Sequence, residues 1–229
     1  MESVGRAAVA EFVATFALIF VGAGAVIVAS TGQLDLVGVA LAHGLVLAIM
    51  VSLTGHISGG QVNPAVTIAL WATGKISTQR GAVLLVSQLL GAVAGALLVR
   101  YVVGGGAFDA GGAGAPALGA GVAAGKGIVI EAILTFFLVF AVFGTVVDDR
   151  GPWNATAGFT IGLVIAFDIL AFGPLTGAAM NPARWFGPAL VGGSWGDAIV
   201  WIVGPIAGGI IAGVLYTTVF LRGREPATP

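Results

Sequence analysis

The chain of 229 residues contains no cysteine and only two histidines. Without cysteine there can be no disulfide, thiol nucleophile or cysteine-ligated metal site. Two histidines make a dedicated metal site unexpected, and we expect no cofactor. Nine basic residues against ten acidic ones leave no basic surface for a nucleic acid.

Charge is scarce as well: charged residues make up 8% of the chain and hydrophobic residues 58%. Soluble proteins carry about 25% charged residues, and the mean hydropathy here is +1.08. A chain this apolar cannot cover a water-soluble domain with polar groups, and it is too hydrophobic to be disordered. What it has in abundance is glycine, 38 residues, and long apolar runs.

The apolar runs predict membrane helices, each of which needs roughly 20 residues. The run that begins at residue 7 contains Glu11 and is too long for the apolar region of a cleaved signal peptide. We therefore expect an all-α membrane protein embedded in a lipid bilayer. Six runs qualify: 7–29, 36–54, 81–103, 127–147, 154–173 and 197–221.

The charges between the runs predict the orientation. Basic residues concentrate on the cytoplasmic side of membrane proteins, and an even number of spans puts both termini on one side. We expect both termini in the cytoplasm, in a protein whose compactness suggests the cytoplasmic membrane of a prokaryote. The inner side would hold Arg6, Lys75, Arg80, Arg150, Arg222 and Arg224, and the outer side Arg100 and Lys126.

Two further apolar runs, 63–72 and 181–191, are too short to cross a bilayer. Both lack the charged face of a surface helix, so we expect them to be re-entrant half-helices. Irregular backbone at membrane depth is tolerated where it lines a wet cavity or is buried in protein. The short runs therefore point to a pore or a transport site.

The two halves of the chain repeat each other. Glu11 matches Glu131 at an offset of 120, and Asn63-Pro64-Ala65 matches Asn181-Pro182-Ala183 at an offset of 118. Three spans per half, an odd number, would turn the second half upside down. We expect an inverted repeat of 1–103 and 127–229, with 104–126 as a plain, flexible Gly/Ala-rich connector.

Asn-Pro-Ala is a helix start, because asparagine caps helices and proline favours the first position. Two such starts from opposite faces would meet at the bilayer midplane. Their positive ends would repel cations, and the amides of Asn63 and Asn181 would donate to a central water. The predicted result is an uncharged but electropositive constriction that orients a single file of water.

At these residues the sequence resembles the aquaporin (major intrinsic protein) family. The resemblance covers essentially the whole chain and implies six tilted helices around two half-helices, in a homotetramer with one pore per subunit. It rests on residues 55–67 (GHISGGQVNPAVT) and 177–184 (GAAMNPAR), with Glu11, Gln88, Glu131 and Gly204-Pro205.

The resemblance also implies a selectivity filter of His43, Ile169, Ala178 and Arg184, a set most like that of plant tonoplast aquaporins. In this reading Arg184 donates to solutes and repels cations, and His43 offers a donor and an acceptor. Strict water filters of the family carry an aromatic residue and a histidine at the first two positions. We therefore expect a wider filter that passes water and also ammonia, hydrogen peroxide, urea and, as the largest candidate, glycerol.

Trp185 stands where glycerol channels of the family carry aspartate, whereas Met180 and the 173–177 loop resemble those channels, so glycerol stays open. Glu11 and Glu131 would hold backbone N–H groups of the re-entrant loops. Carbonyl groups would line the pore at Gly59, Gly60 and Gln61 on one side, and at Gly177, Ala178 and Ala179 on the other.

Two polar residues have open roles. His56 is expected near the inner mouth, as a pore-lining group, a pH sensor or an ordinary loop histidine. Asp168 precedes the filter residue Ile169, and we expect it to brace His43 or Arg184 as an acceptor, with a subunit contact as the alternative.

Other classes of membrane protein also have to be weighed. Secondary transporters share inverted repeats and broken helices, and Asp168 is the residue that could couple an ion. A histidine, serine and aspartate could nominally form an enzyme site, but no nucleophile motif is present. An electropositive constriction argues against an ion channel. A passive channel, not an enzyme, is the prediction.

Overall fold

The computed structural model describes residues 3–150 and 154–223, and within them every regular element is helical. The expected all-α membrane architecture is confirmed, since six helices are long and apolar enough to cross a bilayer. Arg224, counted above, lies outside the described residues. The spans are α1 (Val4–Ser30), α2 (Leu36–Ser58), α4 (Thr78–Val103), α6 with its π-helical extension η2 (Ala124–Val142 and Phe143–Val147), α7 (Ala157–Thr176, after the short η3, Asn154–Thr156) and α9 with η4 (Ala198–Leu215 and Tyr216–Leu221).

Local sequence explains where the first spans begin. Ser3, Asp35 and Ser77 precede α1, α2 and α4, and each side chain accepts a hydrogen bond from a backbone N–H of the first turn. Glycine ends two of the spans: Gly59 after α2 has φ 100° and Gly177 after α7 has φ 76°. This left-handed conformation favours glycine and turns the chain back into the protein.

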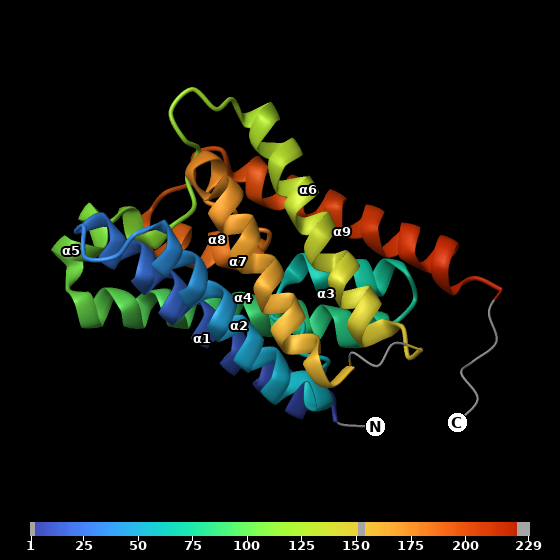
Figure 1. Ribbon diagram of the computed structural model, residues 1–229. Coiled ribbons are helices and arrows are strands. Elements are labelled where there is room, and N and C mark those ends of the chain that lie inside the picture. Colours follow the sequence, from blue (N-terminus) through green and yellow to red (C-terminus); the bar gives the residue numbers. More distant parts are fainter. Residues whose placement is uncertain (1–2, 151–153, 224–229) are drawn as a thin grey trace.

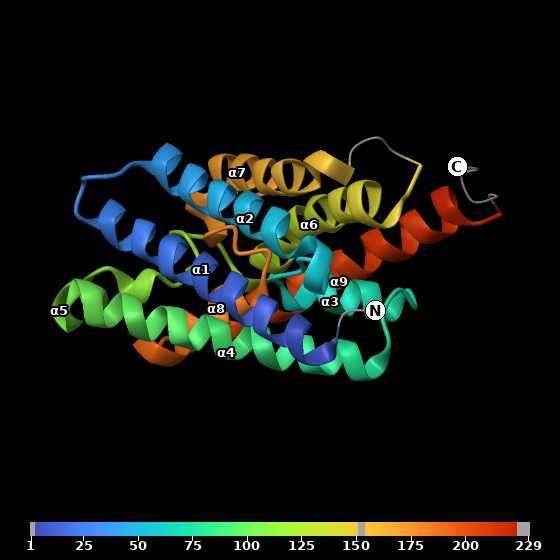
Figure 2. The same ribbon diagram turned by 90° about the horizontal axis from the view of Figure 1, so that it is seen from below.

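The half-helices α3 (Pro64–Ala72) and α8 (Pro182–Gly192) lie between the spans and enter from opposite ends of the molecule (Figure 1). Each packs against the third span of the other half, α3 on α9 and α8 on α4. The two halves are therefore interlocked, and their irregular lead-ins meet in the middle. Figure 2 shows α1 beside α4 and α2 beside α7, running along the same direction.

Glycine allows the first and third spans of each half to touch. A Cβ on Gly91 of α4 would lie 2.4 Å from the Phe12 carbonyl oxygen of α1, and one on Gly208 of α9 would lie 1.9 Å from the Ala132 carbonyl oxygen of α6. Neither distance is possible for a real side chain. Small residues are what bring helix backbones close in a bilayer.

The expectation of a plain flexible connector between the halves is wrong. The segment folds into α5 (Gly105–Ala110) and the short η1 (Gly112–Gly114). Phe108 is fully buried, with the Arg100 guanidinium carbon 5.7 Å from its ring centre. One buried aromatic residue anchors a segment whose composition reads as a linker.

Candidate functional site

The two half-helices begin at matching asparagines in the middle of the molecule. The Asn63 side chain accepts from Ala65 N at 2.8 Å, and that of Asn181 accepts from Ala183 N at 2.9 Å. Both are 3% exposed. Each side-chain oxygen thus serves as a helix cap, which leaves both amide nitrogens turned away from their own helices.

The amide nitrogens link the two halves. Asn63 Nδ2 donates to the Met180 carbonyl at 2.8 Å, and Asn181 Nδ2 donates to the Val62 carbonyl at 2.9 Å. Because an amide NH₂ carries two hydrogens, each asparagine keeps one for another acceptor. This reciprocal pair fixes the distance between the two half-helices at their amino ends.

The lead-ins to both half-helices have unusual backbone at corresponding positions. Positive φ occurs at Gly60 (58°) and Val62 (55°) in the first half, and at Ala178 (44°) and Met180 (52°) in the second. Residues with a side chain rarely adopt this conformation, at a cost of about 1–3 kcal/mol each. Surrounding structure must therefore hold the two segments in place.

Glu11 holds the first lead-in. Its carboxylate is fully buried and accepts four hydrogen bonds: Oε1 from Ser58 Oγ (2.6 Å) and Gln61 N (2.9 Å), and Oε2 from Val62 N (2.6 Å) and Gln88 Nε2 (2.7 Å). Such bonds to a charged group are the strong ones. The expected structural role of Glu11 matches this geometry.

Glu131 holds the second lead-in with fewer bonds. Its Oε1 accepts from Thr176 Oγ1 (2.7 Å) and Ala179 N (3.0 Å), whereas Oε2 has one donor among the described residues, Met180 N (2.7 Å). At the place equivalent to Gln88 stands Pro205, because Gly91 and Gly208 make matching contacts with Phe12 and Ala132, and proline has no side-chain donor. The two halves are alike in design but unequal in the number of donors on the carboxylate.

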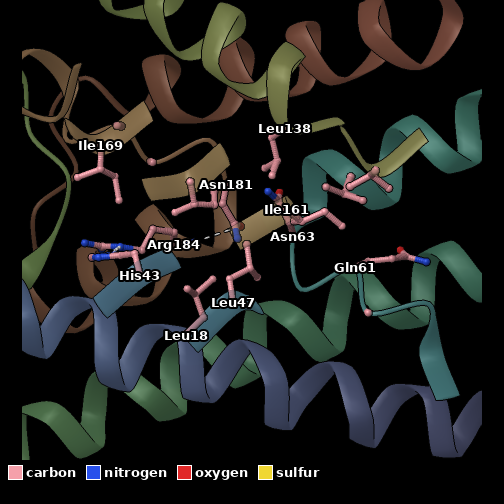
Figure 3. Close-up of a pocket in the computed structure, with 16 residues that line it drawn as sticks. Leu18, His43, Leu47, Gln61, Asn63, Leu138, Ile161, Ile169, Asn181 and Arg184 are labelled. Carbon is pink, nitrogen blue, oxygen red and sulfur yellow. Dashed lines mark hydrogen bonds between the residues drawn. The ribbon is translucent and has the colours of Figure 1, made fainter. Parts of the chain in front are cut away.

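A pocket runs past both asparagines (Figure 3). His43 and Arg184 lie at one end, Asn63 and Asn181 near the middle, and Gln61 toward the other end. Following the orientation expected above, the end with Arg184 is called the outer end and the end with Gln61 the inner end. The pocket has polar residues at these points and apolar residues between them. Its lining comprises Leu18, His43, Leu47, Gly60, Gln61, Asn63, Val66, Leu138, Val142, Ile161, Ile165, Ile169, Ala178, Ala179, Asn181 and Arg184.

Two larger cavities continue this pocket in both directions. The outer one shares Ile169 and Arg184 with it and also contains Gly177. The inner one shares Gln61 and contains Gly59. The three hollows therefore lie next to one another along the spans, and the six residues expected to present carbonyl groups line them.

His43 and Arg184 touch each other at the outer end of the pocket. Arg184 Nε donates to His43 Nε2 at 3.0 Å, and His43 Nδ1 lies 2.9 Å from the Val39 carbonyl. Both ring nitrogens are thus engaged by the protein, so the expectation that His43 offers a donor and an acceptor to solutes is wrong. Arg184 Nη1, by contrast, is buried without a hydrogen-bond partner in the described residues.

Asp168 does not brace the filter as expected. It is 1% exposed, but it makes no hydrogen bond or salt bridge to His43 or Arg184, and Oδ2 has no partner among the described residues. The neighbouring Ile169 does line the pocket. Asp168 and Ile169, adjacent on α7, point in different directions around the helix.

His56 lines the inner cavity beside Lys75 and Arg80. The position is the one expected near the inner mouth. Arg80 also donates through Nη2 to the Ser58 carbonyl at 2.9 Å, which ties the first lead-in to α4. This contact between distant parts of the sequence has no signal in the residue order.

Sequence reasoning missed the apolar part of the lining. Leu18, Leu47, Leu138, Val142 and Ile161 face the pocket. In helices that are apolar on every side, periodicity cannot separate residues that face a passage from those that face lipid. Only the packed arrangement of the spans distinguishes them.

A line of hollows through a six-span helical protein, lined mostly by neutral groups and with two half-helices meeting beside it, defines a membrane channel. Comparison with known proteins agrees. The family model "Major intrinsic protein" matches residues 1–216. The chain is 46% identical to "Aquaporin TIP4-4" of Zea mays over 96% of this chain and 90% of that one. It is 40% identical to "Aquaporin TIP2-1" of Arabidopsis thaliana, with 96% and 89% covered.

A solved structure, the aquaglyceroporin from Plasmodium falciparum, superposes with a TM-score of 0.85 at 26% identity, covering 95% of this chain and 97% of that one. The chain belongs to the major intrinsic protein family. It is a passive channel for water and small solutes, and it is not an enzyme.

Proposed function

We propose that this channel conducts water together with small neutral solutes, namely ammonia, hydrogen peroxide, urea and, at the upper size limit, glycerol. The observation that carries the proposal is the pair Asn63 and Asn181 within the pocket, each with one amide hydrogen left after the bond across to the other half. A neutral solute whose oxygen or nitrogen atom accepts hydrogen bonds from these two amides can pass them without a change of charge on the solute or on the protein.

Ions and protons are excluded by the same geometry. Two helix amino ends, each with about half a positive charge, face the centre of the passage. A water that accepts from both asparagines cannot also accept from its neighbours, so the chain of waters is interrupted for proton transfer. Arg184 adds a fixed positive charge at the outer end of the pocket, and its buried Nη1 has no hydrogen-bond partner among the described residues.

A wide filter is supported by the two small or aliphatic residues beside that arginine. Ile169 and Ala178 line the pocket, and their side chains are apolar. His43 is turned to Arg184, so the outer end presents one donor side chain against a largely apolar wall. Neutral solutes with a polar edge and an apolar edge fit such a wall.

The test is stopped-flow light scattering of proteoliposomes, with water, ammonia, urea and glycerol measured separately and hydrogen peroxide followed with an enclosed dye. We expect faster flux than in protein-free vesicles for every one of these solutes, with the smallest increase for glycerol. His43→Phe should lower urea flux relative to water, because a larger ring narrows the outer end. Arg184→Val should raise proton leak, measured with an enclosed pH dye. If only water passes, the proposal of a wide filter is refuted. If the flux saturates and depends on an ion gradient, the proposal of a passive channel is refuted.

We further propose a homotetramer with both termini in the cytoplasm. The family resemblance supports the tetramer, and the basic residues Lys75 and Arg80 at the inner cavity support the orientation. The curated relatives named above are plant proteins, so they give no support to a prokaryotic cytoplasmic membrane. Cross-linking in vesicles tests the first proposal, and protease access to a tag at the N-terminus tests the second.

A further inference from the structure

The helix α1 has a glycine, Gly22, where it passes the His43 ring. A Cβ built on Gly22 would lie 2.5 Å from His43 Nε2 and 2.7 Å from Cδ2, and the three heavy atoms nearest to it all belong to that ring. Distances this short do not occur between real atoms. The ring therefore occupies the space that any side chain at position 22 would need.

The hydrogen bonds of His43 define its orientation and its tautomer. The Nε group of arginine can only donate, so Nε2 of His43 must be the acceptor. In a neutral ring the proton then sits on Nδ1, which donates to the Val39 carbonyl. The ring is held at one edge by its own helix, α2, and at the other edge by Arg184.

We propose that Gly22 is a determinant of solute selectivity, because the missing side chain on α1 admits the His43 ring in the orientation that fixes Arg184. The role is one of positioning: Gly22 touches no solute and acts through His43. The inference deepens the proposed function and rests on it.

The internal repeat shows that this arrangement occurs in the first repeat and has no counterpart at the matching positions of the second. The offset of 120 that relates Glu11 to Glu131 relates Gly22 to Val142, and the offset of 118 relates His43 to Ile161. Val142 and Ile161 both line the pocket with ordinary aliphatic side chains. At the outer end the corresponding pair is instead a glycine, Gly22, and a ring, His43. Glycine inside a helix lowers the stability by about 1 kcal/mol relative to alanine.

An added methyl group at position 22 leaves the ring few ways to move. Its Nδ1 edge is tied to Val39, so the Nε2 edge must swing away from α1, toward the passage that His43 lines. That movement separates Nε2 from Arg184 and narrows the outer end. Urea, which is wider than water, should be affected more than water.

The chain offers a matched control two residues further along α1. A Cβ on Gly24 would have no heavy atom within 4 Å. Gly22→Ala and Gly24→Ala are the same substitution in the same helix, and they differ in whether His43 is displaced. In proteoliposomes we expect Gly22→Ala to lower the ratio of urea to water permeability by at least about threefold, as the loss of a charge-assisted hydrogen bond allows, and Gly24→Ala to leave it unchanged.

A double variant keeps the test valid if Gly22→Ala folds poorly. In a His43→Ala background the ring is gone, so adding Gly22→Ala should restore folding and cause no further change in the ratio. Nitrogen NMR of the ring gives a readout independent of flux. With His56→Gln as background, the Nε2 resonance of His43 should be that of a hydrogen-bonded acceptor nitrogen in the parent and should move toward that of an unbonded nitrogen in Gly22→Ala, while Nδ1 keeps its proton.

The outcomes separate the two proposals. If the parent conducts no faster than protein-free vesicles, the proposed function has failed, whatever the NMR shows. If the parent conducts but Gly22→Ala matches Gly24→Ala in both the flux ratio and the Nε2 resonance of His43, the role of Gly22 is refuted. An equal effect of Gly22→Ala with and without His43 would refute it too, because the effect would not pass through the ring.

Discussion

Replacing either buried glutamate by glutamine should destabilise the channel, and by unequal amounts. In Glu11 both oxygens accept two hydrogen bonds each. A glutamine there must place its NH₂ group at one of these oxygens, where two donors already point. Whichever way the amide is turned, two hydrogen bonds are lost and donors face donors.

Glu131 has a less costly solution. Its Oε2 has one donor among the described residues, Met180 N, while Oε1 accepts from Thr176 and Ala179. Glutamine can put NH₂ at the Oε2 position and keep the other two bonds. Only one hydrogen bond is lost.

The difference follows from the energy of a hydrogen bond to a charged group, about 1.5–3 kcal/mol. Glu11→Gln, which loses two such bonds, should lower the free energy of unfolding by about 3–6 kcal/mol, and Glu131→Gln, which loses one, by about half of that. For a chain of this size, 1 kcal/mol shifts the unfolding midpoint by about 2–4 °C. The midpoint of Glu11→Gln should therefore lie at least about 3 °C below that of Glu131→Gln.

The assay is thermal unfolding in one detergent at one heating rate, with the two variants as each other's control for size and chemistry. Water permeability per folded protein should fall in both, because both lead-ins carry strained backbone that the carboxylates hold. Equal midpoints, or a lower midpoint for Glu131→Gln, would show that the count of donors does not set the stability.

Other predictions concern packing, a buried acid and a surface ion pair. Gly208→Ala should lower the free energy of unfolding by about 1–3 kcal/mol, because its Cβ would lie 1.9 Å from a backbone carbonyl oxygen of α6. Gly5→Ala is the control: it has open space around its Cβ and should not lower the unfolding midpoint in the same assay. Asp168→Asn should leave the urea-to-water ratio unchanged, because Asp168 does not touch the filter; a changed ratio in proteoliposomes would restore its expected bracing role. Arg150, whose Nε donates to Asp148 Oδ1 at 2.6 Å, lowers the pKa of that carboxyl to about 2. A lowered carboxyl pKa adds stability above about pH 4 that is lost as the pH falls toward 2. The gap in midpoint between the parent and Asp148→Asn should thus be constant from pH 8 to 5 and shrink below about pH 4; a gap that widens on acidification would contradict the assignment.

Most of the fold could be predicted from the residue order. Spans, half-helices and helix starts depend on local properties, namely the length of apolar runs and the capping chemistry of residues such as Asn63 and Asn181. The inverted repeat follows from counting spans. The connector could not be predicted in this way, because its many glycines and alanines conceal the one large side chain that it buries completely, Phe108.

The site was predictable where it repeats. Glu11 and Glu131 recur at matching places, and a repeated charge within a span demands a partner. The direction of a side chain around an apolar helix was not predictable, which is why Asp168 was expected at the filter and Leu138 was not expected in the pocket.

The sequence by itself determined that the chain crosses a bilayer six times, that two short helices start at paired asparagines, and that glutamates support them, since each of these depends on residue type and spacing. Tertiary structure alone decided that His43 turns both nitrogens to the protein, that Arg184 Nη1 has no partner among the described residues, and that Gly22 makes room for the ring. These depend on distances between helices that are remote in sequence, and such distances are set by packing.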